Sequence, residues 1–185
     1  EMTIMGKYFG TGGIRGVVNR ELDCLLAYKA GFAAATVLTR ALSHRAKIFI
    51  GRDTRISGEM LEAALAAGIC AAGADAVLLG VIPTPAVAFL TLAHHADAGV
   101  VISASHNPFE HNGIKIFGGN GCKLSDELEA QVEALIDDPS DAALATDGAI
   151  GRILREEKSA CEEYASHVAA AVGPLDGLRI AVDCA

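Results

Sequence analysis

The stretch DAGVVISASHNPFEHNGIKIFGGNGCK, residues 97–123, predicts two strands joined by a polar loop. Residues 99–102, GVVI, are a short β-branched run typical of a buried strand, and residues 103–108, SASHNP, end it with small, polar and turn-forming side chains. Residues 114–117, IKIF, alternate as a short strand does. Because the loop is too short for a helical crossover, the second strand is expected to run antiparallel to the first.

Outward from this stretch, strand patterns alternate with helical ones. Helices are expected over residues 21–42, 57–73, 84–95 and 125–138, and strands over residues 47–50, 76–79, 99–102 and 114–117. This alternation predicts an α/β protein, a three-layer α/β/α sandwich around a mixed four-stranded sheet whose last strand is antiparallel.

The chain is expected to divide near residue 150. Residues 1–150 would form one domain, and residues 151–185 would form a connection, a helix and the first strand of an incomplete second domain. The helix is expected over residues 159–172, and the apolar run LRIAVD, residues 178–183, predicts the strand. An unpaired apolar strand is a poor end for a domain, which indicates that this strand begins a second one.

Composition limits the classes of partner and compartment. With 185 residues, 51% of them hydrophobic, the chain can bury one substantial core. Its net charge of −8 argues against a nucleic-acid partner but leaves small anionic ligands open. The five cysteines contain no C-x-x-C pair, which argues against a disulfide framework or a zinc site and favours a reducing compartment. No secretory leader is evident, so a cytoplasmic protein is expected.

One uncharged stretch, residues 76–93, has the length of a short membrane span. Pro83 and Pro85 lie in its middle, and prolines there fit a strand, a loop and a helix better than a span. No membrane partner is expected.

Three segments carry candidate chemistry. Ser105 and His106, with Lys115 further on, would place a phosphorylated or acylated hydroxyl beside groups that move protons or stabilise charge, although a surface turn with a solvated lysine has the same pattern. Residues 10–16, GTGGIRG, form a glycine-rich turn in which Arg15 could fork onto a phosphate, but a plain turn is the alternative. The third segment, Arg52-Asp53-Thr54-Arg55, would either steer an anionic sugar phosphate or form a structural salt bridge.

SASHNP followed by NGIKIF closely resembles the active-site serine loop of the α-D-phosphohexomutases, and GTGGIRG resembles the GTDGIRG segment of that family. The resemblance implies a phosphoserine at Ser105, with Arg15 steadying the phosphoryl oxygens and Lys115 in proton transfer or charge stabilisation. His106 and Asn107 would shape the loop, with proton transfer as an alternative role for His106. The residues that the resemblance places around the phosphate and in the loop are Gly10, Thr11, Gly13, Ser103 and Asn107.

The resemblance also implies a reaction. Ser103, where most of the family has Thr, is similar to the branch that interconverts glucosamine 6-phosphate and glucosamine 1-phosphate in bacterial cell-wall precursor synthesis. Mg²⁺ is expected, held in part through the phosphate on Ser105, with a sugar 1,6-bisphosphate as intermediate and activator. The remaining metal ligands and the sugar-recognition loops would lie in later domains, so this stretch alone is expected to be inactive. A homodimer of the full-length chain is a further expectation.

Three rival functions stay open at this stage. A family member could act on mannose or glucose phosphates instead. Ser105 could be a hydrolase nucleophile, although the G-x-S-x-G elbow is missing. Gly12, where the glucosamine-phosphate branch usually has Asp, could mark a module that binds sugar phosphates without chemistry.

Overall fold

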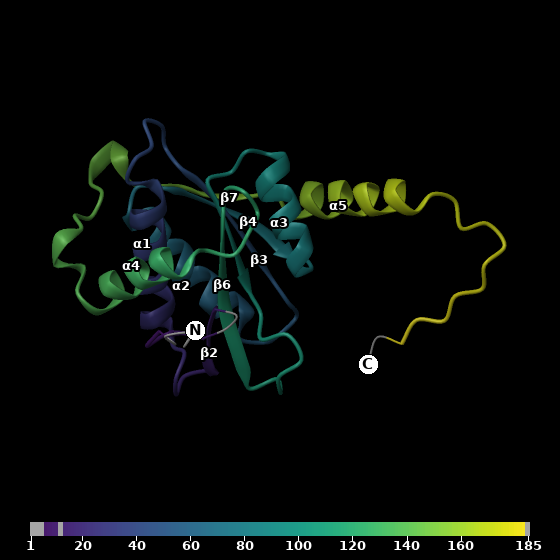
Figure 1. The fold of residues 1–185 in the computed structure, drawn as a ribbon, viewed down its shortest axis with the longest axis horizontal. Coiled ribbons are helices and arrows are strands. Elements are labelled where there is room, and N and C mark those ends of the chain that lie inside the picture. Colours follow the sequence, from purple (N-terminus) through teal and green to yellow (C-terminus); the bar gives the residue numbers. More distant parts are fainter. Residues whose placement is uncertain (1–5, 11–12, 184–185) are drawn as a thin grey trace.

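The computed structural model describes residues 6–10 and 13–183, which form a mixed sheet with helices on both faces (Figure 1). The sheet has seven strands in the order β1-β2-β6-β5-β3-β4-β7. The strands are β1 (Phe9–Gly10), β2 (Gly13–Val17), β3 (Lys47–Arg52), β4 (Asp75–Val81), β5 (Ala98–Ile102), β6 (His111–Gly118) and β7 (Ile153–Arg155). The helices are α1 (Cys24–Thr39), α2 (Gly58–Ala71), α3 (Thr84–Ala93), α4 (Asp126–Asp137) and α5 (Glu157–Val172), with short 3₁₀ turns η1 (Pro139–Asp141) and η2 (Asp147–Ala149).

The sheet is mixed, as predicted, but the expected count of four strands was wrong. β5, β3, β4 and β7 run parallel, and β6 is antiparallel to β5. β1 and β2 continue the antiparallel side beyond β6. They were missed because they lie in the glycine-rich segment, which has no alternation of apolar side chains. β7 was missed because it has only three residues, two of them exposed.

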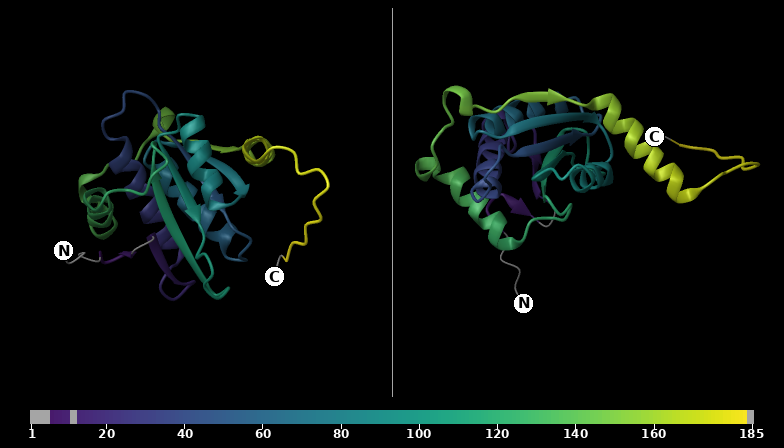
Figure 2. Two further views of the ribbon diagram at one scale, coloured as in Figure 1. Left: turned by 45° about the vertical axis from the view of Figure 1, so that its right-hand side comes forward. Right: turned by 90° about the horizontal axis from the view of Figure 1, so that it is seen from above.

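Helices cover both faces of the sheet (Figure 2). Successive residues of a strand point to opposite faces, so β3 contributes to two cores. Ile48 and Ile50 belong to the core cluster that includes residues of α1, α2 and α4, whereas Phe49 belongs to a second cluster with residues of α3 and α5. The described residues thus form three layers, helix on sheet on helix.

Helices α1 and α2 pack closely because glycines lie at their contact. A Cβ at Gly68 would fall on the Tyr28 carbonyl oxygen and lie 2.8 Å from the Phe32 amide nitrogen, and neither backbone atom can move aside cheaply. Gly68→Ala is therefore expected to lower the free energy of unfolding by about 3 kcal/mol, at the upper end of overpacking costs. Urea denaturation followed by circular dichroism measures this difference.

The matched control is Gly148→Ala, because a Cβ at Gly148 would meet no atom within 4 Å. Its denaturation midpoint should equal that of the unsubstituted chain. If Gly68→Ala also left the midpoint unchanged, the close contact between α1 and α2 would be wrong.

Of the two serines predicted to cap helices, one makes the cap bond and the other does not. The Ser125 hydroxyl accepts from the Leu128 amide and caps α4, as expected. Ser57 stands at the N-cap of α2, but its hydroxyl makes no cap bond. It accepts instead from the Asn112 side-chain amide at 2.9 Å, a contact between residues 55 apart in sequence. This bond joins the start of α2 to the start of β6.

The end of the chain differs from its prediction. Residues 173–183 contain no strand, and the expected strand over residues 178–183 was wrong. Leu178, Ile180 and Val182 are 64%, 65% and 76% exposed. A strand needs a neighbour for its backbone groups, and no strand of the described residues lies beside this segment. The division near residue 150 stays a prediction; β7 lies just beyond it and pairs with β4.

The uncharged stretch forms β4, a turn and α3, as expected. In the part of the chain that the structure describes, no helix is both long enough and apolar enough to cross a membrane.

Candidate active site

The polar loop between β5 and β6, residues 103–110, lies at the edge of the sheet where the neighbouring strands β3 and β5 end. Both strands are buried and parallel, and their carboxyl ends form the edge of the sheet where ligands gather in α/β proteins. The Ser103 amide donates to the Gly113 carbonyl at 2.9 Å, which extends the β5–β6 pairing into the loop. The loop therefore starts from a fixed position at this edge.

Ser105 is exposed, as its predicted role requires. Its φ is +59°, in the left-handed region that only few non-glycine residues occupy. Its amide donates to the Ser103 hydroxyl at 3.0 Å, and its own hydroxyl lies 3.4 Å from His106 Nδ1. Ser103 itself is buried, so Ser105 presents the accessible hydroxyl of this pair. A residue with a strained backbone and an exposed hydroxyl beside an imidazole is an arrangement found at functional sites.

Arg15 and Lys115 lie on the same face of the sheet. Arg15 on β2 pairs with Gly113 on β6, and paired residues of antiparallel strands share a face. Lys115 is two residues from Gly113 and thus on that face too. A Cβ at Gly113 would lie 3.1 Å from Arg15 Cγ, so the arginine side chain crosses over this glycine. Arg15 and Lys115 thus lie on one face of neighbouring strands, while their roles stay a prediction.

The pKa of Lys115 responds to Arg15 and to Asp53, so the three charges lie near one another. Partial burial lowers the pKa of Lys115 below its ordinary value, and the nearby Arg15 guanidinium lowers this pKa further. The Asp53 carboxylate acts in the opposite direction and raises the pKa of Lys115. An anion placed among these side chains would meet positive charge from two strands.

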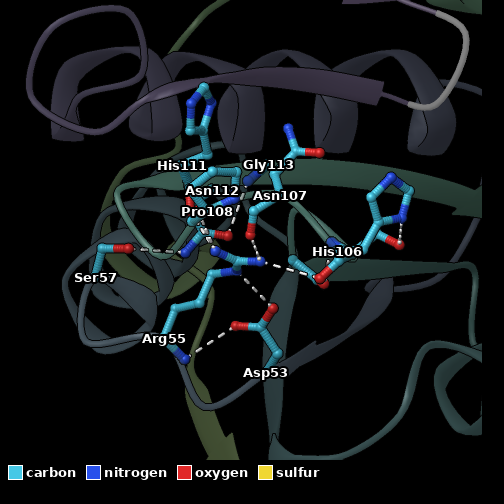
Figure 3. A network of polar contacts seen from close by, with 11 residues as sticks. Asp53, Arg55, Ser57, His106, Asn107, Pro108, His111, Asn112 and Gly113 are labelled. Carbon is cyan, nitrogen blue, oxygen red and sulfur yellow. Dashed lines mark hydrogen bonds and ion pairs between the residues drawn. The ribbon is translucent and has the colours of Figure 1, made fainter. Parts of the chain in front are cut away.

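Arg55 connects the end of β3 to the serine loop (Figure 3). Its guanidinium donates to the backbone carbonyls of Ser105, Asn107, Pro108 and His111, and to the Asp53 carboxylate. Arg52 points elsewhere, to Glu59 and Glu62 of α2. The sequence alone groups the two arginines, because the four carbonyls that distinguish Arg55 lie 50 to 56 residues further along the chain.

The glycine-rich segment forms a β1–β2 hairpin, in which Gly10 pairs with Gly13. Gly13 has φ of +99°, and a Cβ there would fall on the Ile114 carbonyl oxygen, so glycine is required where the hairpin passes β6. Thr11 and Gly12 lie outside the described residues. Glu133 on α4 was missed by the sequence analysis; it accepts from the Tyr8 and Phe9 amides at 2.6 and 2.7 Å and holds the start of β1.

The predicted metal site is not formed by the described residues alone. They contain no group of three or more His, Cys, Asp or Glu side chains that could hold a metal ion. Mg²⁺ prefers several oxygen ligands, and of the predicted set only the Ser105 oxygen belongs to this chain.

A cleft of about 840 Å³ is lined in part by the end of this loop. It is lined by residues 17–20, 56, 57, 60 and 108–111. Neither Ser105 nor Arg15 nor Lys115 lines it, so the candidate site is the exposed edge of the sheet rather than this cleft.

The chain is similar to known sugar-phosphate mutases in sequence and in fold. Residues 6–143 match the family model described as phosphoglucomutase/phosphomannomutase, alpha/beta/alpha domain I. Over 183 residues the chain is 55% identical to a phosphoglucosamine mutase of Clostridium botulinum, covering 98% of this chain and 40% of the relative. It is 53% identical to a phosphoglucosamine mutase of Acetivibrio thermocellus with the same coverage. The chain thus spans about 40% of the length of the curated relatives it matches.

A solved structure has the same fold. The crystal structure of a phosphoglucomutase/phosphomannomutase family protein from Burkholderia thailandensis superimposes with a TM-score of 0.71 at 27% identity. The match covers 85% of this chain and 34% of that one.

Proposed function

The chain belongs to the phosphoglucomutase/phosphomannomutase family, and from that premise we propose that it carries the phosphoserine of a mutase acting on glucosamine phosphates. The observation that carries the proposal is the position of Ser105. Its hydroxyl is exposed at the end of β5, and Arg15 and Lys115 share the adjoining face of the sheet. A transferring phosphoryl group spreads negative charge over its oxygens, and such cations stabilise that charge.

The chemistry is two phosphoryl transfers through Ser105 Oγ. In the first, the bond from phosphorus to Ser105 Oγ breaks and a bond to a sugar hydroxyl oxygen forms, while the proton of that hydroxyl passes to the freed Ser105 Oγ. The resulting sugar 1,6-bisphosphate reorients. In the second, Ser105 Oγ takes the phosphoryl from the other end of the sugar and gives up its proton, which the released sugar oxygen gains. Lys115 is the candidate for holding charge or moving a proton, with His106 as an alternative donor or acceptor.

The proposed sugar is glucosamine phosphate. The support comes from the relatives named phosphoglucosamine mutase at 53% and 55% identity, against 27% for the solved structure named for the broader family. Ser103, in place of the Thr that most of the family has, agrees with this choice.

Mg²⁺ is proposed as the cofactor of the full-length enzyme. When bound, it supplies positive charge beside the transferring group. Ser105 would contribute one ligand through its phosphate, and the other ligands would come from outside this chain. We therefore propose that the chain by itself does not turn over sugar phosphates.

The test uses the purified full-length protein. Peptide mass spectrometry is expected to find phosphate on Ser105, and glucosamine 6-phosphate should give a higher kcat/KM than the 6-phosphates of mannose or glucose. A protein with no phosphate on Ser105 and no turnover of any of the three sugars would overturn the proposal. A preference for mannose or glucose would overturn the choice of sugar and keep the phosphoserine.

A further inference from the structure

We propose that Arg55 is the positioning residue of the serine loop, and that it sets the direction of Ser105 Oγ by holding the backbone carbonyls of Ser105 and of three residues that follow it. The inference rests on the proposed function only where it assigns phosphoryl transfer to Ser105. Arg55 contacts Ser105 through its backbone carbonyl and not through the hydroxyl that is expected to carry the phosphoryl group. It would act through the loop backbone alone.

Every donor of the Arg55 side chain has an acceptor. The guanidinium has five N–H groups. Nε donates to Asp53 Oδ2 at 3.0 Å. One terminal nitrogen donates to the carbonyls of Pro108 and His111 at 2.7 and 3.1 Å, and the other to those of Ser105 and Asn107 at 3.0 and 2.8 Å. No N–H group of Arg55 is left for a substrate phosphate. Arg55 therefore does not fit the alternative in which it would steer an anionic sugar phosphate.

The four carbonyls need this particular cation. Three of them lie in the loop of residues 103–110, and the fourth is that of His111 at the start of β6, so one guanidinium ties the loop to the strand that follows it. The Arg55 side chain is only 10% exposed, and charge-assisted bonds are strong where water is excluded. A lysine would bring the same charge but only three donors from a single nitrogen, which cannot span four carbonyls.

The hold on Ser105 acts from two sides. Its amide donates to the Ser103 hydroxyl, and its carbonyl accepts from Arg55. Between these two bonds the residue keeps its left-handed φ of +59°, which a serine would otherwise leave. With the Arg55 bond removed, the backbone can relax toward negative φ and carry the Ser105 hydroxyl away from its place.

Asp53 completes the arrangement. Its second oxygen accepts from the Arg55 backbone amide at 3.1 Å, so one carboxylate fixes both the backbone and the side chain of Arg55. Asp53 follows β3 directly, at the buried sheet edge. Asp53 and Arg55 thereby fix the loop to the end of β3.

The experiment compares Arg55→Lys with Arg45→Lys in the full-length enzyme. Arg45 is a matched control, because its guanidinium likewise donates to two backbone carbonyls, Gly148 and Ile150, and to the Asp75 carboxylate. It precedes β3, whereas Arg55 follows that strand, so it lies at the opposite edge of the sheet. Both variants lose a fork onto backbone carbonyls, but only one loses it at Ser105.

Arg55→Lys is expected to lower kcat about 100-fold, the cost of a small misplacement of a reacting group, while KM stays near its wild-type value. Amide hydrogen exchange in residues 104–112 should become faster. Arg45→Lys should leave kcat unchanged. In Arg55→Ala, added methylguanidinium should restore part of kcat, and methylammonium should not.

Two results would overturn the proposal. One is a wild-type kcat in Arg55→Lys, whatever happens to loop exchange, because Arg55 would then be merely structural. The other is a raised KM with unchanged kcat, because Arg55 would then bind substrate. Hydrogen exchange separates this test from the proposed function. Slow loop exchange in the wild type and fast exchange in Arg55→Lys would support the hold on the loop even if the wild type showed no mutase activity.

Discussion

Ser105→Ala in the full-length protein is expected to lower kcat on the order of 10⁴-fold or more, the scale seen when an enzyme loses its nucleophile. Alanine has no oxygen to carry the phosphoryl group, and the neighbouring Ser103 hydroxyl is buried and already accepts a bond from the Ser105 amide. A coupled assay for glucosamine 1-phosphate formation measures the loss. Peptide mass spectrometry should find no phosphate in the loop.

The fold should survive this change. Ser105 is exposed and alanine keeps the backbone bonds to Arg55 and Ser103, so the free energy of unfolding should change by no more than about 0.5 kcal/mol. Ser140→Ala is the control, since Ser140 is another exposed serine in a turn, with its amide bonded to Asp138. It should keep full activity. If Ser105→Ala still turned over substrate at the wild-type rate, the phosphoserine account would fail.

The order of helices and strands could be predicted from local patterns. Residues 47–50 and 99–102 are β-branched or apolar runs bounded by turns, and they became the centres of β3 and β5. The antiparallel direction of β6 followed from the shortness of the loop before it. The position of Ser105 followed as well, because a loop that leaves a buried strand must start at the sheet edge.

Other features depend on contacts between distant residues, which a local pattern does not contain. The segment around Gly13 becomes a strand because β6 lies beside it, not because its side chains alternate. Ser57 lies where the sequence predicts a helix cap, but its hydroxyl accepts a hydrogen bond from the Asn112 side chain instead. The role of Arg55 depends on four carbonyls that converge only once the loop has folded.

Lys115→Met carries the second large effect, and it should separate activity from stability. Loss of a group that moves a proton or holds charge in the transition state is expected to lower kcat about 10² to 10⁴-fold. The same change should leave the free energy of unfolding near pH 7 equal or raise it. Burial and Arg15 lower the pKa of Lys115, which means that its charged form is less favourable in the folded chain than in the unfolded one.

The sign of the pH dependence follows from that lowered pKa. Below the folded pKa of Lys115 both states carry the proton, and the folded state bears the full cost of the charge. As pH rises through the folded pKa toward the unfolded one, the unfolded chain binds more protons, so the wild type gains stability over this interval. Lys115→Met should lack that gain. Urea denaturation at a series of alkaline pH values measures it in both proteins.

The kcat profile gives a second measure of the same group. If the ammonium form holds charge, wild-type kcat should fall as pH rises through the folded pKa of Lys115, at a lower pH than an ordinary lysine would give; if the free amine takes a proton, kcat should rise there. The residual activity of Lys115→Met should show neither change. Lys158→Met, at a lysine 90% exposed on α5, is the control and should match the wild type in kcat and in stability. A Lys115→Met variant with wild-type kcat, or one markedly less stable than the wild type near pH 7, would contradict an active-site lysine kept charged at a cost to the fold.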